Sequence, residues 1–249
     1  MRKNLADYYA EDMYERDRAR DSARVVVPMV MALTHPSSVL DIGCGRGAWL
    51  GEFKANGASK IVGLDGSYLK QSTLLFPPDC FRPTDLSGKF EIPAGRFDLA
   101  MCLEVAEHLP SVNARYLVQQ LTSAASQVLF SAAPPGQGGR GHINCQPLSY
   151  WRKFFEEFGF KMLDPFRPKL RDDSRVAWWY RQNMVLFASP EAIAANPALA
   201  DCAEVPRGLE SEWLYMWVAE SQAAGPATRV RRLTGKVIRG ARKALRPKA

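Results

Sequence analysis

The stretch that decides the fold is Val39-Leu40-Asp41-Ile42-Gly43-Cys44-Gly45-Arg46-Gly47. A short apolar run typical of a buried strand leads directly into a turn with three glycines, and the pattern predicts a helix over 48–56. Glycine lets the backbone turn tightly and lets a ligand approach it closely. The first turn of the following helix offers unpaired N–H groups to an anionic group. A glycine turn placed between a strand and a helix therefore predicts a ligand-binding loop.

The rest of the chain alternates between strand and helix patterns. Strands are expected over Ile61–Asp65, Phe97–Cys102, Gln127–Ala132 and Trp178–Ala188, and helices over 5–33, Val112–Ala125 and Tyr150–Phe158. This alternation predicts an α/β fold with a mostly parallel, doubly wound sheet. Ser189-Pro190-Glu191 is typical of a helix start, with a capping residue before proline.

Composition and charge divide the 249 residues into four expected parts. These are an N-terminal helical segment over 1–35, a ligand-binding domain over 36–190, a helical extension over 191–224 and a basic tail over 225–249. The tail holds nine Lys and Arg and no acid, whereas the other 224 residues hold 24 basic and 26 acidic groups. The net charge of +7 therefore belongs to the tail, which disfavours a catalytic domain surrounded by nucleic acid.

Two acidic positions follow the glycine loop. Asp65 ends the second predicted strand, where an acid can accept hydrogen bonds from both ribose hydroxyls of a nucleoside. Asp85 lies beyond a proline-rich loop, where its carboxylate can accept from an adenine amino group while Leu86 offers a backbone N–H. The alternative for either acid is a solvated side chain in a loop.

Four segments together resemble class I S-adenosylmethionine (SAM)-dependent methyltransferases. They read VLDIGCGRGAWL, IVGLDGS, TDL and FDLAMCLEVAEHLP, and the resemblance covers about residues 36–190. It implies a Rossmann-like seven-stranded sheet whose last strand is antiparallel, with the final two strands within 160–188. The cofactor-binding residues that it implies are Asp41, Gly43, Gly45, Gly47, Asp65, Gly66, Ser67, Asp85, Leu86 and Glu104.

A group of acidic residues and histidines indicates a second candidate site. Glu104, Glu107 and His108 follow a predicted strand, and a glycine-rich loop further on contains His142. This pattern resembles metal-dependent O-methyltransferases that act on small-RNA ribose ends or on catechol rings. The resemblance implies that these four residues bind Mg²⁺ or Mn²⁺, with Glu107, His108 and His142 as catalytic residues. The alternatives are metal-free base catalysis by His108 or His142 and a purely structural role.

The segment SAAPPGQGGRGHINCQPLSYWRKFFEEFGF resembles methyltransferases of polysaccharide or natural-product pathways. It implies a sugar or glycan hydroxyl, lipid-linked or nucleotide-linked, as the methyl acceptor. RNA ribose and small phenolic molecules are alternative acceptors, and a non-catalytic SAM-binding protein is the alternative outside enzymes. The aromatic residues that suit stacking on a sugar or packing in the core are Trp151, Trp178, Trp179 and Tyr180.

The basic tail has an amphipathic helical pattern that predicts binding to an anionic membrane surface, with an acidic partner or RNA as alternatives. No run of residues is long and apolar enough for a transmembrane helix, and the five scattered cysteines favour reduced thiols. These features predict a cytoplasmic protein, peripheral at the inner membrane face if the tail binds lipid.

Overall fold

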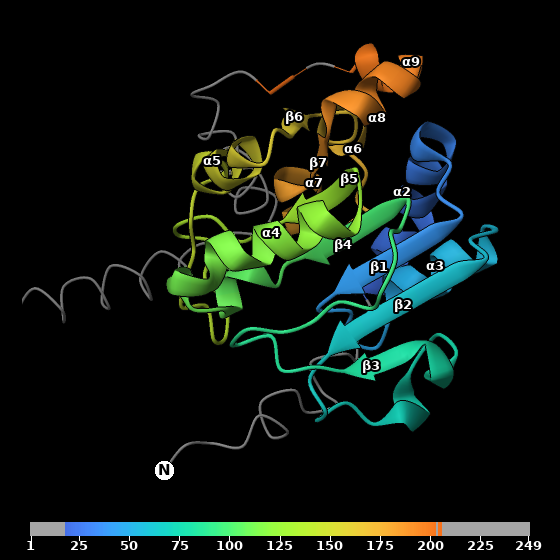
Figure 1. The fold of residues 1–249 in the computed structure, drawn as a ribbon, viewed down its shortest axis with the longest axis vertical. Helices are drawn as coiled ribbons and strands as arrows, with labels where there is room; N and C mark the ends of the chain where they lie inside the picture. Colours follow the sequence, from blue (N-terminus) through green and yellow to red (C-terminus); the bar gives the residue numbers. More distant parts are fainter. Residues whose placement is uncertain (1–17, 203, 206–249) are drawn as a thin grey trace, which may run out of the picture. The chain divides into compact units, whose positions relative to one another are not determined.

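A seven-stranded sheet lies at the centre of the computed structural model, which describes residues 18–202, 204 and 205. Its strand order is β3-β2-β1-β4-β5-β7-β6 (Figure 1). The strands are β1 (Ser38–Ile42), β2 (Lys60–Asp65), β3 (Phe81–Pro83), β4 (Leu99–Leu103), β5 (Gln127–Ser131), β6 (Lys161–Leu163) and β7 (Val185–Ala188). β7 pairs antiparallel with both β5 and β6, which confirms the predicted fold class and its reversed last strand.

Helices cover both faces of the sheet. They are α2 (Arg18–Thr34), α3 (Ala48–Ala55), α4 (Ala114–Ala124), α5 (Leu148–Glu157), α6 (Arg167–Leu170), α7 (Trp178–Asn183), α8 (Pro190–Ala195) and α9 (Pro197–Ala200). One apolar cluster joins α2, α3 and α7 to the sheet, and a second joins α4 and α5 to its opposite face. In Figure 1, α4 accordingly lies across the face opposite α2 and α3. The two apolar layers hold the strand ends in fixed positions.

The strand order reverses beside β1. From β1 the chain runs outward through β2 and β3, then returns to place β4 on the other side of β1. In register, Asp41 of β1 lies between Gly63 of β2 and Met101 of β4. Ligands of open α/β sheets bind at the carboxyl ends of the strands at such a reversal. The fold therefore brings the glycine loop after β1 beside the segment after β4.

The predicted strand over Trp178–Ala188 is half wrong. Residues 178–183 form α7, and only Val185–Ala188 form the strand β7. The aromatic residues favoured a strand, but Tyr180 packs edge-on against Trp49 of α3, with ring centroids 5.1 Å apart. A helical turn buries Tyr180 through Asn183 on that side of the sheet, so tertiary packing overrides strand propensity.

Several of the predictions concern segments near the two ends of the chain. The helix expected over 5–33 is described from Arg18 to Thr34, with Pro28 inside it, and its first part lies outside the described residues. Ser189 caps α8 by accepting from the Ala192 N–H, as the sequence indicates. The extension beyond Val205 and the basic tail lie outside the described residues, and the predicted four-part division stays a prediction.

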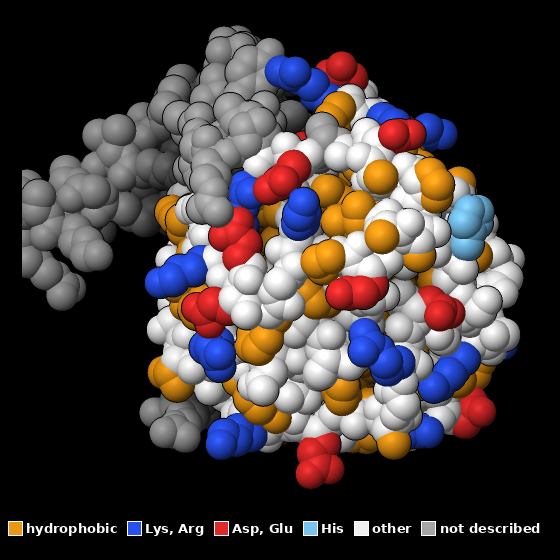
Figure 2. All heavy atoms as spheres, turned by 45° about the horizontal axis from the view of Figure 1, so that its top comes forward, with side chains coloured by type: hydrophobic (Ala, Val, Ile, Leu, Met, Phe, Trp, Pro, Cys, Tyr) orange, Lys and Arg blue, Asp and Glu red, His pale blue; other side chains and the backbone are white. Residues whose placement is uncertain are grey.

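The described surface carries mixed charge. Figure 2 shows basic and acidic side chains interspersed on the face that it draws, with apolar side chains between them. All five cysteines are free. Within the described ranges, no helix is long and apolar enough to cross a membrane.

Candidate active site

A cavity of about 780 Å³ opens at the carboxyl ends of β1, β2 and β4. Its volume lies within the range of small-molecule and cofactor sites. Nine of the ten residues expected to bind the cofactor line it. They are Asp41, Gly43, Gly45, Asp65, Gly66, Ser67, Asp85, Leu86 and Glu104. The fold thus gathers side chains from four separate segments around one space.

Gly47 is the expected residue that does not line the cavity. Its φ is +78°, and a Cβ atom there would lie 2.0 Å from the ring of Phe76. Gly47 also occupies the position before the first residue of α3. Its role is therefore to let the loop turn into the helix beneath the ring of Phe76.

The other two glycines of the loop, Gly43 and Gly45, line the cavity themselves. Gly43 has φ +85°, and a Cβ atom there would lie 2.4 Å from Val105. Gly45 has φ +52°, and no described atom lies within 4 Å of the position that its Cβ would take. Because Gly45 lines the cavity, the absent side chain leaves that space to a ligand.

Two buried carboxyl groups, those of Asp41 and Asp65, lie next to the glycine loop. Desolvation, reinforced by the nearby charge of Asp65, raises the pKa of Asp41 to about 8. Burial also raises the pKa of Asp65, against hydrogen bonds that lower it. Both acids therefore hold protons more tightly than free aspartate, and a cationic ligand nearby favours their ionised forms.

Asp65 already holds three donors. Its Oδ2 accepts from the Gly45 N–H at 2.7 Å, and its Oδ1 accepts from the Gly66 N–H at 2.6 Å and from the Tyr68 hydroxyl. A carboxylate offers about four lone-pair sites, so these contacts leave one. The sequence interpretation missed Tyr68; its place three residues after the acid is the signal that could have found it.

Asp85 and Leu86 lie at the β3 end of the cavity. Asp85 Oδ1 accepts from the Ser87 N–H at 2.9 Å and from the Ser87 hydroxyl at 2.6 Å. These two hydrogen bonds lower the pKa of Asp85, because they favour the ionised carboxylate. The turn therefore presents an ionised acceptor, which suits an amino group of a ligand.

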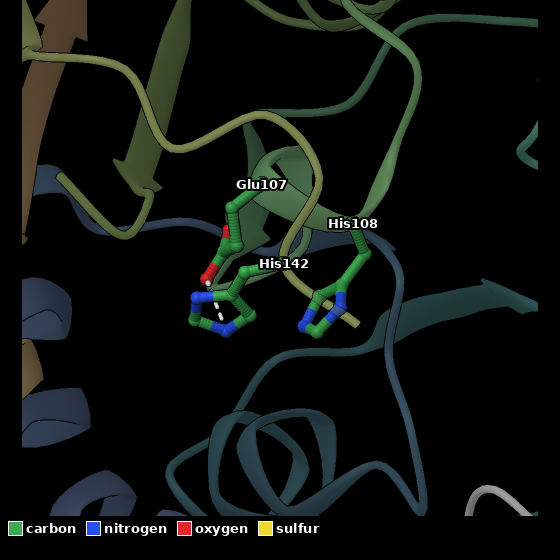
Figure 3. Close-up of side chains that lie close together, drawn as sticks. All are labelled: Glu107, His108 and His142. Carbon is green, nitrogen blue, oxygen red and sulfur yellow. Dashed lines mark ion pairs between the residues drawn. The ribbon is translucent and has the colours of Figure 1, made fainter. Parts of the chain in front are cut away.

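A second constellation adjoins the cavity. Glu107, His108 and His142 each place one ligand atom within 4.8 Å of the others (Figure 3). Glu107 and His108 belong to the short turn η4 (Ala106–His108), and His142 comes from the loop after β5. His142 Nε2 lies 3.9 Å from Glu107 Oε1, and the two imidazole rings meet edge to face at 4.8 Å.

The Glu107 carboxyl group is the unusual member. It is completely buried, and neither oxygen makes a hydrogen bond of ordinary geometry within the described part of the chain. Desolvation, followed by the charge of Glu104, raises the pKa of Glu107 well above its ordinary value. Burial lowers the pKa of His108 and of His142, so both imidazoles are neutral near pH 7. Two neutral imidazoles beside a buried carboxyl group without hydrogen bonds fit a divalent cation, whose charge would favour the ionised carboxylate.

Glu104 was expected to join this group, but the structure gives it other partners. It has a left-handed backbone with φ +56°, and its carboxylate accepts from the Gln137 amide at 2.8 Å and the Asn183 amide at 3.1 Å. Gln137 and Asn183 also bond each other at 2.8 Å. Glu104 therefore lines the cavity within an amide network that the sequence did not indicate.

Aromatic side chains close the cavity on the α7 side. Trp179 and Tyr180 line the cavity together with Trp49 and with Arg18 at the start of α2. The other two aromatic residues proposed for stacking, Trp151 and Trp178, are not part of this lining, and Trp151 is fully buried in the core. The wall combines flat apolar rings with one cationic side chain.

Comparisons with known proteins identify the family and the fold of the chain. Residues 14–164 match the family model described as a methyltransferase domain. Magnesium protoporphyrin IX methyltransferase (ChlM) from Synechocystis PCC 6803, solved with bound SAM, is 20% identical with a TM-score of 0.51, covering 70% of this chain and 81% of that one. DesVI from Streptomyces venezuelae is 14% identical with a TM-score of 0.55, covering 75% and 98%.

A third similar structure is a protein from Nostoc punctiforme PCC 73102 described as a putative O-methyltransferase. It is 13% identical with a TM-score of 0.51, covering 69% of this chain and 57% of that one. No curated protein matches the sequence significantly. At these identities the structural likeness establishes the fold.

Proposed function

Because the chain belongs to the methyltransferase domain family, its methyl donor is SAM, and we propose that it methylates a hydroxyl group of a sugar or glycan. The observation that carries this proposal is the buried Glu107 carboxyl group, unpaired and flanked by two neutral histidines. His108 belongs both to this cluster and to the cofactor cavity. The cluster thus lies where an acceptor hydroxyl can meet the methyl donor.

The chain's own residues bind the donor in three parts. The backbone of the glycine loop leaves room for the methionine portion, and Asp65 is positioned for the ribose hydroxyls. Asp85 presents its ionised carboxylate for the adenine amino group. SAM, when bound, supplies an electrophilic methyl group on a sulfonium. Holding donor and acceptor in line then supplies much of the rate.

We propose that Glu107, His108 and His142 hold a divalent cation, Mg²⁺ or Mn²⁺. Such a cation lowers the pKa of a hydroxyl bound to it and orients that hydroxyl. Glu107 offers two unpaired oxygens, and each imidazole offers a lone pair because its pKa is lowered. An imidazole that binds the cation has no free lone pair, so His108, which also lines the cavity, accepts the acceptor's proton only in the metal-free alternative.

A sugar acceptor is supported by the wall of the cavity. Trp179 and Tyr180 offer flat apolar surface, on which the C–H face of a pyranose can pack. Glu104, which also lines the cavity, is held by the amides of Gln137 and Asn183, and its carboxylate is an acceptor of the kind that hydroxyls require. The combination of a flat apolar surface and a polar acceptor suits a polyol better than a purely aromatic molecule.

The test is formation of S-adenosylhomocysteine (SAH) across nucleotide sugars, glycans, catechols and short RNAs, with Mg²⁺, Mn²⁺ or a chelator. We expect turnover on a sugar that is lost with chelator and in the Glu107→Gln variant. Glu91→Gln, at an exposed acid, is the matched control and should keep full activity.

Other outcomes contradict particular parts of the proposal. Turnover confined to RNA or catechol rejects the sugar acceptor. Activity that survives chelation, with normal turnover of Glu107→Gln, rejects the cation and leaves base catalysis by a histidine. Tight SAM binding without turnover on any acceptor rejects the enzyme in favour of a SAM-binding protein.

The basic tail over 225–249 lies outside the described residues, and its binding to anionic membrane stays a prediction from the sequence. Co-sedimentation of the full chain with anionic and neutral vesicles tests it. Equal recovery with both kinds of vesicle would reject an electrostatic membrane anchor.

A further inference from the structure

The loop over 137–146 encloses the His142 ring on several sides. The ring of His108 meets it edge to face at 4.8 Å. A Cβ atom on Gly139 would lie 2.2 Å from the ring, so any residue other than glycine at this position would displace the ring. Cys145 Sγ lies 3.5 Å from His142 Nδ1, within hydrogen-bond distance for sulfur.

The same loop is fastened to the turn that carries Glu107. The N–H groups of Ile143 and Asn144 both donate to the Glu107 carbonyl, each at 2.9 Å. The Asn144 amide reaches the Ala106 carbonyl at 3.4 Å. These contacts fix the backbone directly after His142. The orientation of the ring is therefore set, and the remaining variable is which ring nitrogen carries the proton.

The two nitrogens of His142 face different partners. Nε2 lies 3.9 Å from Glu107 Oε1, whereas Nδ1 faces the sulfur of Cys145. A histidine that binds a cation through one nitrogen donates its other N–H to a neighbouring acceptor, which fixes the tautomer. A buried carboxylate with both oxygens unpaired points independently to a cation at the Nε2 side.

We propose that Cys145 is a positioning residue whose sulfur accepts the Nδ1 proton of His142 and so keeps the Nε2 lone pair directed at Glu107. This inference rests on the cation site of the proposed function. Cys145 touches neither the donor cavity nor the Glu107 carboxylate by any contact in the described part of the chain. It acts only through the imidazole.

The experiment reads the tautomer of His142 directly, by ¹⁵N-edited NMR of the full chain without metal at one fixed pH. In the wild-type protein we expect the Nδ1–H tautomer. In Cys145→Ala the acceptor is gone, and we expect the Nε2–H tautomer that free histidine prefers. Cys145→Ser keeps an acceptor of similar size and should retain the Nδ1–H tautomer, which separates this role from packing.

Mn²⁺ affinity, measured by titration calorimetry, is the second readout. Loss of such a supporting contact typically weakens metal binding about tenfold or more, which we expect for Cys145→Ala and not for Cys145→Ser. Cys202→Ala is the matched control, because within the described residues the Cys202 sulfur makes its hydrogen bond to the Ala198 carbonyl, away from His142. It should change neither readout.

Two results separate the inference from the proposed function. An Nε2–H tautomer in the wild-type protein, or the same tautomer in wild type and Cys145→Ala, overturns the positioning role. No Mn²⁺ binding by the wild-type protein, together with the expected tautomer change, supports the positioning role while rejecting the cation.

Discussion

Removing the Asp41 carboxylate should make the ligand-free protein more stable at high pH. Burial first, and the charge of Asp65 second, raise the pKa of Asp41 from 3.8 to about 8. The folded state therefore binds this proton more tightly than the unfolded state. Its contribution to stability is complete below pH 4 and is lost as the pH rises from 4 to 8.

The size of this effect on stability follows from the shift in the pKa of Asp41. Each pH unit between the two pKa values changes the free energy of unfolding by about 1.4 kcal/mol, so four units amount to roughly 6 kcal/mol. That is a large part of the ~5–15 kcal/mol that stabilises a typical domain. In Asp41→Asn the ionisable group is gone, and this part of the pH dependence disappears with it.

The assay is urea unfolding of wild type and Asp41→Asn at pH 5, 6.5 and 8, followed by tryptophan fluorescence. The stability of Asp41→Asn relative to wild type should rise by about 1.4 kcal/mol per pH unit. Asp201→Asn, at an exposed acid, is the control and should track wild type at every pH. A constant difference between wild type and Asp41→Asn across these pH values would refute the reasoning.

Three further changes test the site and the core. Gly45→Ala should cost about 1 kcal/mol of stability from its left-handed backbone, and should weaken SAH binding at least about tenfold because its methyl group enters the cavity. Gly159→Ala, also left-handed in open space, should carry a similar stability cost with unchanged SAH affinity, and equal SAH affinities in the two variants would contradict this account. Tyr68→Phe should bind SAH about fivefold more tightly, since the ribose no longer displaces a hydrogen bond worth ~1 kcal/mol from Asp65; calorimetry showing weaker binding would mean that the hydroxyl helps the ligand. Trp151→Ala should lose about 3–5 kcal/mol in urea unfolding, because Trp151 is fully buried, and a loss below 1 kcal/mol would contradict its place in the core.

Local sequence patterns predicted the elements that depend on neighbouring residues. The apolar run before three glycines predicted β1 and its loop, and the structure gives left-handed angles at Gly43, Gly45 and Gly47. The Ser189-Pro190 pair predicted the start of α8. In each case the physical cause lies within a few residues, so a linear pattern contains it.

The same reasoning failed where distant residues decide the outcome. The aromatic run from Trp178 predicted a strand, but packing of Tyr180 against Trp49 makes its first half helical. The shared cation site expected for Glu104, Glu107 and His108 stays a prediction. What local spacing did not indicate is that the Glu104 carboxylate accepts hydrogen bonds from Gln137 and Asn183, which belong to distant segments.

The sequence by itself determined the fold class, the SAM family and the short set of acids, glycines and histidines from which the site is built. Only the tertiary structure decided how these residues combine. His142 lies 34 positions after His108 in the chain, yet its ring packs on His108 because the loop after β5 is fastened to the Glu107 carbonyl. Residue types and spacings specify local geometry, whereas contacts between distant segments depend on strand order and on the backbone hydrogen bonds that fix the loops.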